Sequence, residues 1–139
     1  MVLKLLIPVL GAKEATEAAR HGAFLFAEQC VSEVEVIEVL SDASQGRAVA
    51  FHSPATLRRR EKDEARDALM QTRAILDDAG VPYTWKRVFG PTARTIAQHA
   101  AQAHADIVLL DASQLGFFHR WIVLARLWQL SSTPVTMLH

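Results

Sequence analysis

Residues 2–9 of the chain form a continuous run of apolar side chains that only Lys4 interrupts. A strand with one face in water alternates polar and apolar residues, whereas an unbroken apolar run is typical of a strand that is buried on both faces. Pro8 has no backbone N–H to donate to a neighbouring strand, which places it near the end of this strand, where pairing stops. The run therefore predicts a buried strand of a parallel sheet that has helices on both of its faces.

The rest of the sequence alternates strand-like and helical patterns. Residues 33–40 are rich in valine and predict a strand, whereas residues 12–29 repeat small and apolar side chains at helical spacing. Such alternation requires crossover connections, and these give a mainly parallel sheet that is covered by helices. Because no repeat, low-complexity tract or linker interrupts it, the chain is predicted to form a single domain over residues 1–139. Further strands are predicted over residues 83–89, 106–110 and 135–138. Further helices are predicted over residues 54–79, 92–105 and 117–130, and Thr92 is the predicted N-cap of the second of these. A loop is predicted over residues 41–54.

Charge and cysteine content exclude several classes of function. The 15 basic residues equal the 15 acidic ones, so the sequence offers no overall attraction to nucleic acid or to an anionic membrane. Cys30 is the only cysteine, which excludes an internal disulfide and a multi-cysteine metal site. No apolar segment approaches the roughly 18–20 residues of a membrane span, and no cleavage site follows the first apolar run. We therefore expect a cytoplasmic protein with no nucleic-acid partner and no membrane span.

The six histidines form no recognisable metal-binding pattern. His99 and His104 are five residues apart on one predicted helix, whereas two ligands on one helix face are three or four residues apart. The other histidines are far apart in the sequence, so all of them are predicted to lie on the surface or in loops, with no metal site. The sequence also lacks a nucleophile–base pairing and a carboxylate pair, and we therefore expect no catalytic residues and no enzyme activity.

The predicted helix over residues 117–130 is apolar on nearly all of its sides, unlike an ordinary helix on the surface of a monomer. Exposed Trp and Phe side chains mark association sites, so we predict a subunit interface through Trp121 and Trp128, with a second copy or another protein as the partner. Burial of the whole helix within its own domain and docking on a membrane surface are the alternatives. The polar residues of the helix are His119, Arg120, Arg126 and Gln129.

Four short motifs, in order along the chain, carry a resemblance to a known family. The motifs are Leu5-Leu6-Ile7-Pro8-Val9-Leu10-Gly11-Ala12 in the first strand, Gly90-Pro91 before the third helix, the alanine-rich run from Ile96 to Ala105 that leads into Asp106-Ile107-Val108, and Thr133-Pro134-Val135 at the last strand. Together they resemble the universal stress proteins, and the resemblance covers the whole chain.

The resemblance implies a three-layer α/β sandwich of the adenine nucleotide alpha hydrolase-like type. Its five-stranded, mainly parallel sheet would have the strand order 3-2-1-4-5, with helices on both faces. The resemblance also implies a cytoplasmic stress-response or regulatory binding protein that acts as a homodimer. Because such proteins commonly dimerise through the last strand, it adds Pro134, Val135 and Met137 to the interface that is predicted for the two tryptophans.

The chain departs from the family pattern at the nucleotide site. Members that bind ATP have an aspartate at the end of the first strand, where this chain has Leu10. Their phosphate loop consists of a glycine, two residues, a glycine, nine residues and then Gly-Ser or Gly-Thr. Asp111 and Gln114 take the first two glycine positions here, and the final pair falls at residues 124–125 or 121–122. Because only glycine lets backbone amides approach phosphate oxygens closely, we expect no usual ATP site and no cofactor.

Two alternatives keep a ligand in the crevice at the strand ends. In the first, the protein binds an adenine nucleotide, ATP with Mg²⁺, through an altered loop and hydrolyses it slowly, and Asp111 holds a metal ion or a ribose hydroxyl. In the second, the crevice senses a small molecule or a lipid headgroup, with Trp121 as one wall. The residues predicted to line the crevice are Pro8, Val9, Leu10, Gly11, Val39, Asp111, Ser113 and Gly116.

Overall fold

The computed structural model describes four stretches of the chain, residues 3–10, 16–40, 69–111 and 117–138. A helical segment over residues 69–78 precedes β3. The other elements are β1 (Leu3–Leu10), α1 (Thr16–Ala27), β2 (Val31–Leu40), β3 (Tyr83–Phe89), α3 (Thr92–Gln102), β4 (Ile107–Asp111), α4 (Phe117–Leu130) and β5 (Val135–Leu138).

Several predictions fall on residues outside these stretches. They concern Gly11, Ser113 and Gly116 of the predicted crevice, the loop over residues 41–54 and most of the predicted helix over 54–79.

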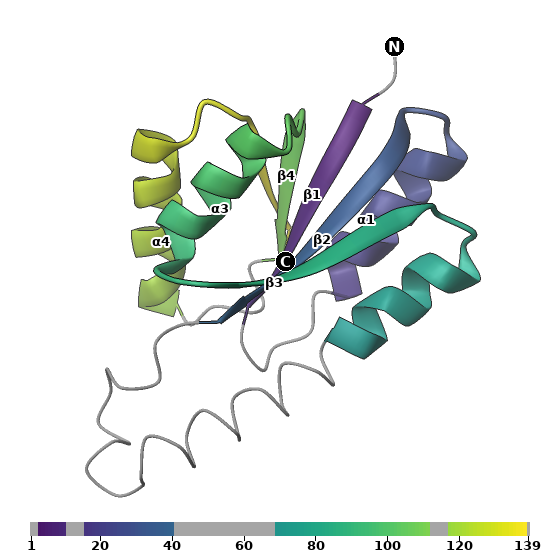
Figure 1. Ribbon diagram of the computed structural model, residues 1–139, viewed down its shortest axis with the longest axis horizontal. Coiled ribbons are helices and arrows are strands. Elements are labelled where there is room, and N and C mark those ends of the chain that lie inside the picture. The colour runs from purple at the N-terminus through teal and green to yellow at the C-terminus, as the bar shows by residue number, and fades with distance from the viewer. Residues whose placement is uncertain (1–2, 11–15, 41–68, 112–116, 139) are drawn as a thin grey trace, which may run out of the picture.

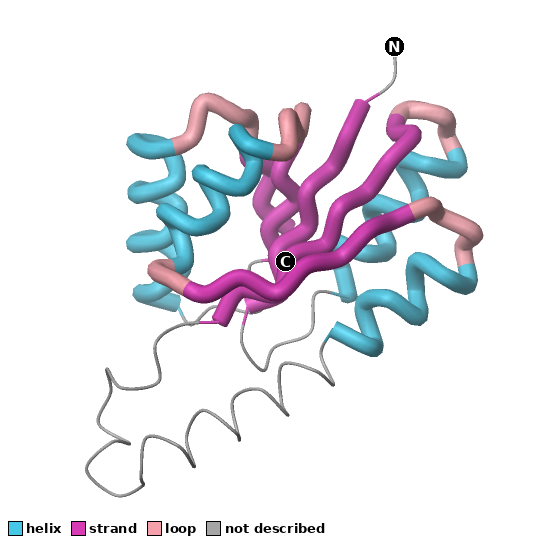
Figure 2. The backbone as a smooth tube through the Cα atoms, in the orientation of Figure 1, coloured by secondary structure: helices cyan, strands magenta, loops and turns pink. Residues whose placement is uncertain are grey.

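The five strands form one parallel sheet in the order β3-β2-β1-β4-β5 (Figure 1). Figure 2 shows α1 and the helical segment 69–78 on one face of this sheet, and α3 and α4 on the other. The predicted three-layer sandwich and its strand order are therefore confirmed. Among the helices that the structure describes, none is long and apolar enough to cross a membrane.

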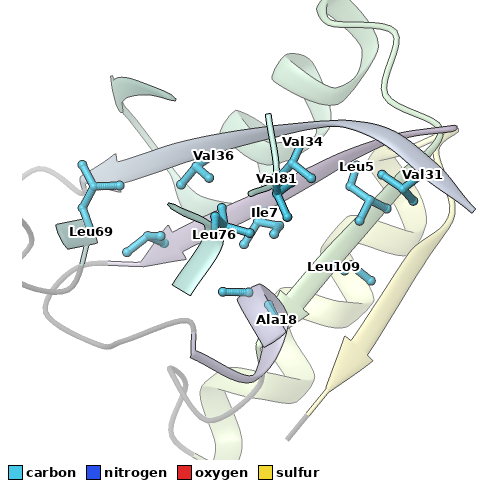
Figure 3. Packing of buried hydrophobic residues seen from close by; sticks show 12 residues of the cluster. Leu5, Ile7, Ala18, Val31, Val34, Val36, Leu69, Leu76, Val81 and Leu109 are labelled. Carbon is cyan, nitrogen blue, oxygen red and sulfur yellow. The ribbon is translucent and has the colours of Figure 1, made fainter. Parts of the chain in front are cut away.

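β1 is buried on both faces because successive side chains of a strand point to opposite sides of the sheet. Leu5, Ile7 and Val9 pack into a cluster with α1 and the segment 69–78 (Figure 3). Leu6 and Leu10 pack into a second cluster with α3 and α4. The unbroken apolar run of this strand thus supplies one row of side chains to each of two cores.

The strand boundaries differ from the predicted ones by one or two residues. β1 and β4 each run one residue further than predicted, because Leu10 still pairs with Val39 and Asp111 still pairs with Leu138. β2 begins two residues earlier than predicted, at Val31, which still pairs with β1. At their carboxyl ends, β1 and β4 therefore continue to the edge of the sheet where the predicted crevice lies.

The helices α1 and α3 end earlier than predicted. α1 ends at Ala27 and α3 at Gln102. Just beyond them, Gln29 and His104 have positive φ angles of 63° and 55°. A left-handed residue turns the chain away from the helix axis, which explains why neither helix continues.

The turn before α3 corrects the predicted start of that helix. Thr92 is the first helical residue, and the N-cap is Pro91, with φ −60°, ψ 134° and no side-chain cap hydrogen bond. The N–H of Gly90 donates a hydrogen bond of 3.0 Å to the carbonyl of Leu40, which ties the turn to β2. The fixed φ of proline places the extended residue at Pro91, so the helix starts one residue earlier than it would with a threonine cap at position 92.

Replacing Gly90 with alanine is expected to destabilise the fold strongly. A Cβ at this position would lie 2.7 Å from Oγ1 of Thr95, and the φ of +145° is rare for any residue with a side chain. We expect the free energy of unfolding to fall by about 3 kcal/mol. Gly80→Ala is the matched control, because its φ is +70° and no atom lies within 4 Å of the added Cβ, so it should cost about 1 kcal/mol. Urea denaturation measures both, and equal losses would contradict this account of Gly90.

Candidate functional site

The carboxyl ends of the parallel strands meet at one edge of the sheet, and the strand order reverses there between β1 and β4. In open α/β sheets, ligands bind at such a switch point. Pro8, Val9 and Leu10 end β1, Val39 pairs with Leu10 from β2, and Asp111 ends β4. The structure therefore brings these five predicted crevice residues to the same edge of the sheet.

Three of these residues contribute to the two cores, and one of them, Val9, packs on the α1 side of the sheet. Leu10 and Val39 are buried in the cluster under α3 and α4. The side chain at the end of β1 is therefore a packing group, and it supplies no polar atom to the crevice.

Asp111 is fully buried, and its carboxylate contacts the start of α1. Its Oδ2 accepts hydrogen bonds from the backbone N–H groups of Glu17, at 3.0 Å, and Ala18, at 3.4 Å. The first amides of a helix have no acceptor within the helix, and the positive end of the helix dipole favours a negative charge. Asp111 is therefore the acceptor for the first turn of α1, a place where many α/β proteins bind an external anion.

A second carboxylate, that of Glu38, is fully buried beside Val9 on the α1 side of the sheet. Arg87, its neighbour in β3, places Nε 3.2 Å from Oε1 of Glu38. Among the described residues, neither carboxylate oxygen accepts a well-aligned hydrogen bond, so the contact with Arg87 is an ion pair. A buried charge without a counter-charge would be costly, and Arg87 supplies that counter-charge.

The buried acid on the opposite face of the sheet, Glu35, lies among three basic side chains. Its Oε1 is 2.8 Å from Nε2 of His99 and 3.9 Å from Nζ of Lys86, and its Oε2 is 3.4 Å from Nζ of Lys4. Burial acts to raise the pKa of Glu35, but the hydrogen bond and charge of His99, together with Lys4, outweigh it. The pKa of Glu35 therefore lies below its ordinary value of 4.5.

The prediction that the histidines lie on the surface is wrong for His99, which is buried against β2, whereas His104 is exposed as predicted. A signal for the buried pair was present in the sequence of β2. Glu35 and Glu38 are three residues apart, so they point to opposite faces of the strand. When both faces are covered by helices, each acid is buried and needs a basic partner. Within the described stretches, no three His, Cys, Asp or Glu side chains are close enough together to hold a metal ion.

An apolar groove of about 580 Å³ lies between α4 and the start of β5. Trp121, Trp128, Pro134 and Val135 line it, and the two tryptophan side chains are 58% and 87% exposed. Met137 is partly buried and packs against the core under α3 and α4 instead. The structure therefore places four of the five predicted interface residues around one groove.

The two long sides of α4 that face away from the core remain exposed. Of the α4 side chains that the structure describes, Val123 and Leu127 are buried, whereas Ile122 and Leu130 are exposed along with the tryptophans. The alternative in which the domain buries the whole helix is therefore wrong.

Comparisons with known proteins identify relatives of this arrangement. The model of the universal stress protein family matches residues 1–139. A protein of that family from Burkholderia pseudomallei has a similar structure, with 19% identity, coverage of 96% of this chain and 94% of that chain, and a TM-score of 0.70. No curated protein sequence matches the chain.

Two further similar structures are described with nucleotides. The universal stress protein from Archaeoglobus fulgidus in complex with dAMP is 13% identical, with coverage of 100% of this chain and 98% of that chain and a TM-score of 0.68. A universal stress protein family protein from Arabidopsis thaliana with AMP bound is also 13% identical, with coverage of 98% and 90% and a TM-score of 0.64. At these identities the likeness shows a common fold.

The buried Glu35 pair predicts a specific dependence of stability on pH. Because the pKa of Glu35 is lowered in the folded state, its ionised form stabilises the protein above the ordinary pKa of 4.5, and this contribution is lost as the pH falls through the folded-state pKa. At pH 7, Glu35→Gln should therefore lower the free energy of unfolding by about 3 kcal/mol.

Urea denaturation between pH 7 and pH 3 tests this dependence. The difference between the wild type and Glu35→Gln should shrink as the solution becomes more acidic than pH 4.5. Glu33→Gln is the control, because Glu33 is exposed and its contact with Lys4 is a surface ion pair of 3.7 Å, worth about 0.5 kcal/mol. A difference for Glu35→Gln that stays constant down to pH 3 would contradict the ion-pair account.

Proposed function

The chain belongs to the universal stress protein family, and from that premise we propose that it is a cytoplasmic stress-response binding protein. It acts as a homodimer, by binding or regulation and not by catalysis, and it lacks the ATP site that is usual in the family. The observation that carries this proposal is the carboxylate of Asp111, which lies buried on the first turn of α1 at the edge where a nucleotide would bind.

The position of Asp111 opposes the binding of a triphosphate in two ways. Its side chain stands at the first glycine position of the phosphate loop, so the backbone cannot approach phosphate oxygens as closely as a glycine allows. Its negative charge would also repel a phosphate, by about 4 kcal/mol at 4 Å and an effective dielectric constant of 20. At the end of β1, the buried Leu10 stands where ATP-binding members of the family have an aspartate, so this second feature of the usual site is missing as well.

The groove between α4 and β5 supports the homodimer. Within the described stretches, β5 is an edge strand that pairs with β4 alone, so one side of its backbone has no strand neighbour there. Beside it, Trp121 and Trp128 expose large apolar surfaces. A second copy that presents the same edge and the same groove about a two-fold axis would cover both features at once. A different protein with an apolar helix is the other partner that this surface fits.

The second candidate function is adenine-nucleotide binding through an altered phosphate loop. It is favoured by the two structures of the same fold that are described with dAMP and with AMP bound. In this case ATP with Mg²⁺ would occupy the edge formed by Pro8, Val39 and Asp111, and the metal ion would offset the charge of Asp111. A sensor of a small molecule or lipid headgroup in the same crevice is a third, weaker proposal.

The homodimer predicts the effect of a single charge in the groove. Trp128→Glu should convert a dimer into a monomer without changing the secondary structure, because a buried carboxylate at the interface would lack a partner. Sedimentation velocity at micromolar concentration measures the assembly, and circular dichroism measures the secondary structure. Phe24→Glu is the matched control, because Phe24 is an exposed aromatic residue of α1 on the other face of the sheet. A monomeric wild type, or a Trp128→Glu variant that remains dimeric, would contradict the proposal.

Restoring the aspartate of the first strand should not restore ATP binding. In the Leu10→Asp variant, Asp111 still occupies the first turn of α1 and the glycine loop is still missing. Calorimetric titration with ATP and Mg²⁺ should therefore detect no binding tighter than about 1 mM. Leu10→Asn is the control for the loss of an apolar core residue, and circular dichroism must show that both variants are folded. Tight binding by Leu10→Asp alone would favour the second candidate function.

A further inference from the structure

A second pocket, distinct from both the crevice and the apolar groove, lies between the start of α3 and α4. It has a volume of about 440 Å³, within the range of small-molecule sites. Thr92 and Arg94 line it from α3, and Ile122, Arg126, Gln129 and Leu130 line it from α4. We propose that this pocket binds a small organic phosphate monoester, with the phosphate held by the two arginines.

The charge of the pocket is positive and uncompensated. Arg94 and Arg126 are both exposed, and in the part of the chain that the structure describes neither forms an ion pair. The described residues that line the pocket include no aspartate or glutamate. Two guanidinium groups without counter-charges line one cavity from facing elements, and each offers a fork of N–H donors that suits an oxyanion.

The start of α3 adds donors of the same kind. Pro91, the N-cap, makes no side-chain cap hydrogen bond, and the first turn of α3 contains no acidic residue. The first backbone N–H to bond within the helix is that of Thr95, which donates to the carbonyl of Pro91 at 2.9 Å. The N–H groups of Thr92, Ala93 and Arg94 precede it, and they supplement the arginines as donors to an anion. In α1, by contrast, Asp111 already supplies the anion.

The other wall of the pocket is apolar and defines the rest of the ligand. Ile122 and Leu130 are 55% and 52% exposed, and they line the pocket beside the buried Val123. An exposed isoleucine and leucine next to two arginines suit a ligand that has an anionic end and a compact apolar body. Inorganic phosphate alone would leave this apolar wall in water.

A phosphate monoester fits the charges better than a carboxylate does. It carries about −1.5 to −2 charges at pH 7 and three acceptor oxygens, so it matches two guanidinium groups and the N–H groups of α3. A carboxylate carries one charge and two acceptor oxygens, and it would leave one arginine without a partner. A triphosphate would bring about twice the charge that the pocket can neutralise.

The pocket uses a side of α4 that the proposed dimer leaves uncovered. Trp121 and Trp128 line the groove beside β5, whereas Ile122 and Arg126 line the pocket beside α3. The two cavities therefore divide the exposed sides of α4 between an apolar surface and a mixed, basic one. Ligand binding in the pocket and dimerisation can be tested separately.

The test is a titration of the 139-residue chain with phenyl phosphate, monitored by backbone amide NMR. We expect the amides of residues 92–95 and of α4 to shift in a saturable way, with a dissociation constant below about 1 mM. Benzoate, which has the same ring and a carboxylate, should bind at least about tenfold more weakly, and so should inorganic phosphate.

Two variants and a control make the assignment specific. Arg94→Gln and Arg126→Gln should each weaken phenyl phosphate binding about tenfold, and the double variant should abolish it, because each loses a charge-assisted interaction. Arg20→Gln, at an exposed arginine of α1, should bind as the wild type does.

Two results would overturn the proposal. One is the absence of shifts in residues 92–95 at about 10 mM phenyl phosphate, and the other is undiminished binding by a folded double variant. Stronger binding of benzoate would overturn the choice of a phosphate. None of these results depends on whether the protein is a dimer or binds ATP.

Discussion

The hydrogen bonds between the carboxylate of Asp111 and the first turn of α1 connect two of the elements that border the predicted crevice. They join the end of β4 to the helix that follows β1, across the point where the strand order reverses. The start of a helix is an anion site, and here a side chain of the chain itself supplies the anion. The first amides of α1, which could bind an external anion, thus hold two layers of this domain together.

Asp111 is one of several charged side chains that are buried between the sheet and its helices, and each of them needs a partner. The middle of β2 is covered on both faces, so the acids at positions 35 and 38 cannot reach water, unlike Glu33 near the start of the strand. Glu35 is held by His99 and Lys4 on the α3 side, and Glu38 by Arg87 on the α1 side. Such pairs add little net stability, because desolvation offsets their attraction, but breaking one is costly. They therefore fix how β2 aligns with β1, β3 and α3, since a slip of one residue would separate each acid from its partner.

The sequence predicts the strands well, because the apolar run of β1 and the alternation of elements are local patterns that the two cores preserve. The strand order, by contrast, followed from the resemblance to the family. The sequence predicts less where the outcome depends on facing elements. His99 is buried because it pairs with Glu35 of β2, on the sheet that α3 covers. The spacing of histidines along α3 does not predict this contact. Likewise, a carboxylate at position 111 indicates that a glycine is missing, but only the packing of α1 on β4 reveals what that carboxylate binds. Apolar residues on every side of α4 predict an interface. That one side of this helix borders an apolar groove and another side a basic pocket depends on where α3 packs, which the sequence of α4 does not show.

The measurement that tests this account most directly is a calorimetric titration of ATP and Mg²⁺ into wild-type protein purified free of nucleotide, combined with mass spectrometry of what co-purifies. If Asp111 occupies the anion site of α1, the titration should give no binding heat and the purified protein should carry no adenine nucleotide. Binding with a dissociation constant below about 0.1 mM, or a co-purified nucleotide in stoichiometric amount, would contradict the account. It would mean that the carboxylate leaves the helix, or is neutralised by a metal ion, when a nucleotide enters the crevice.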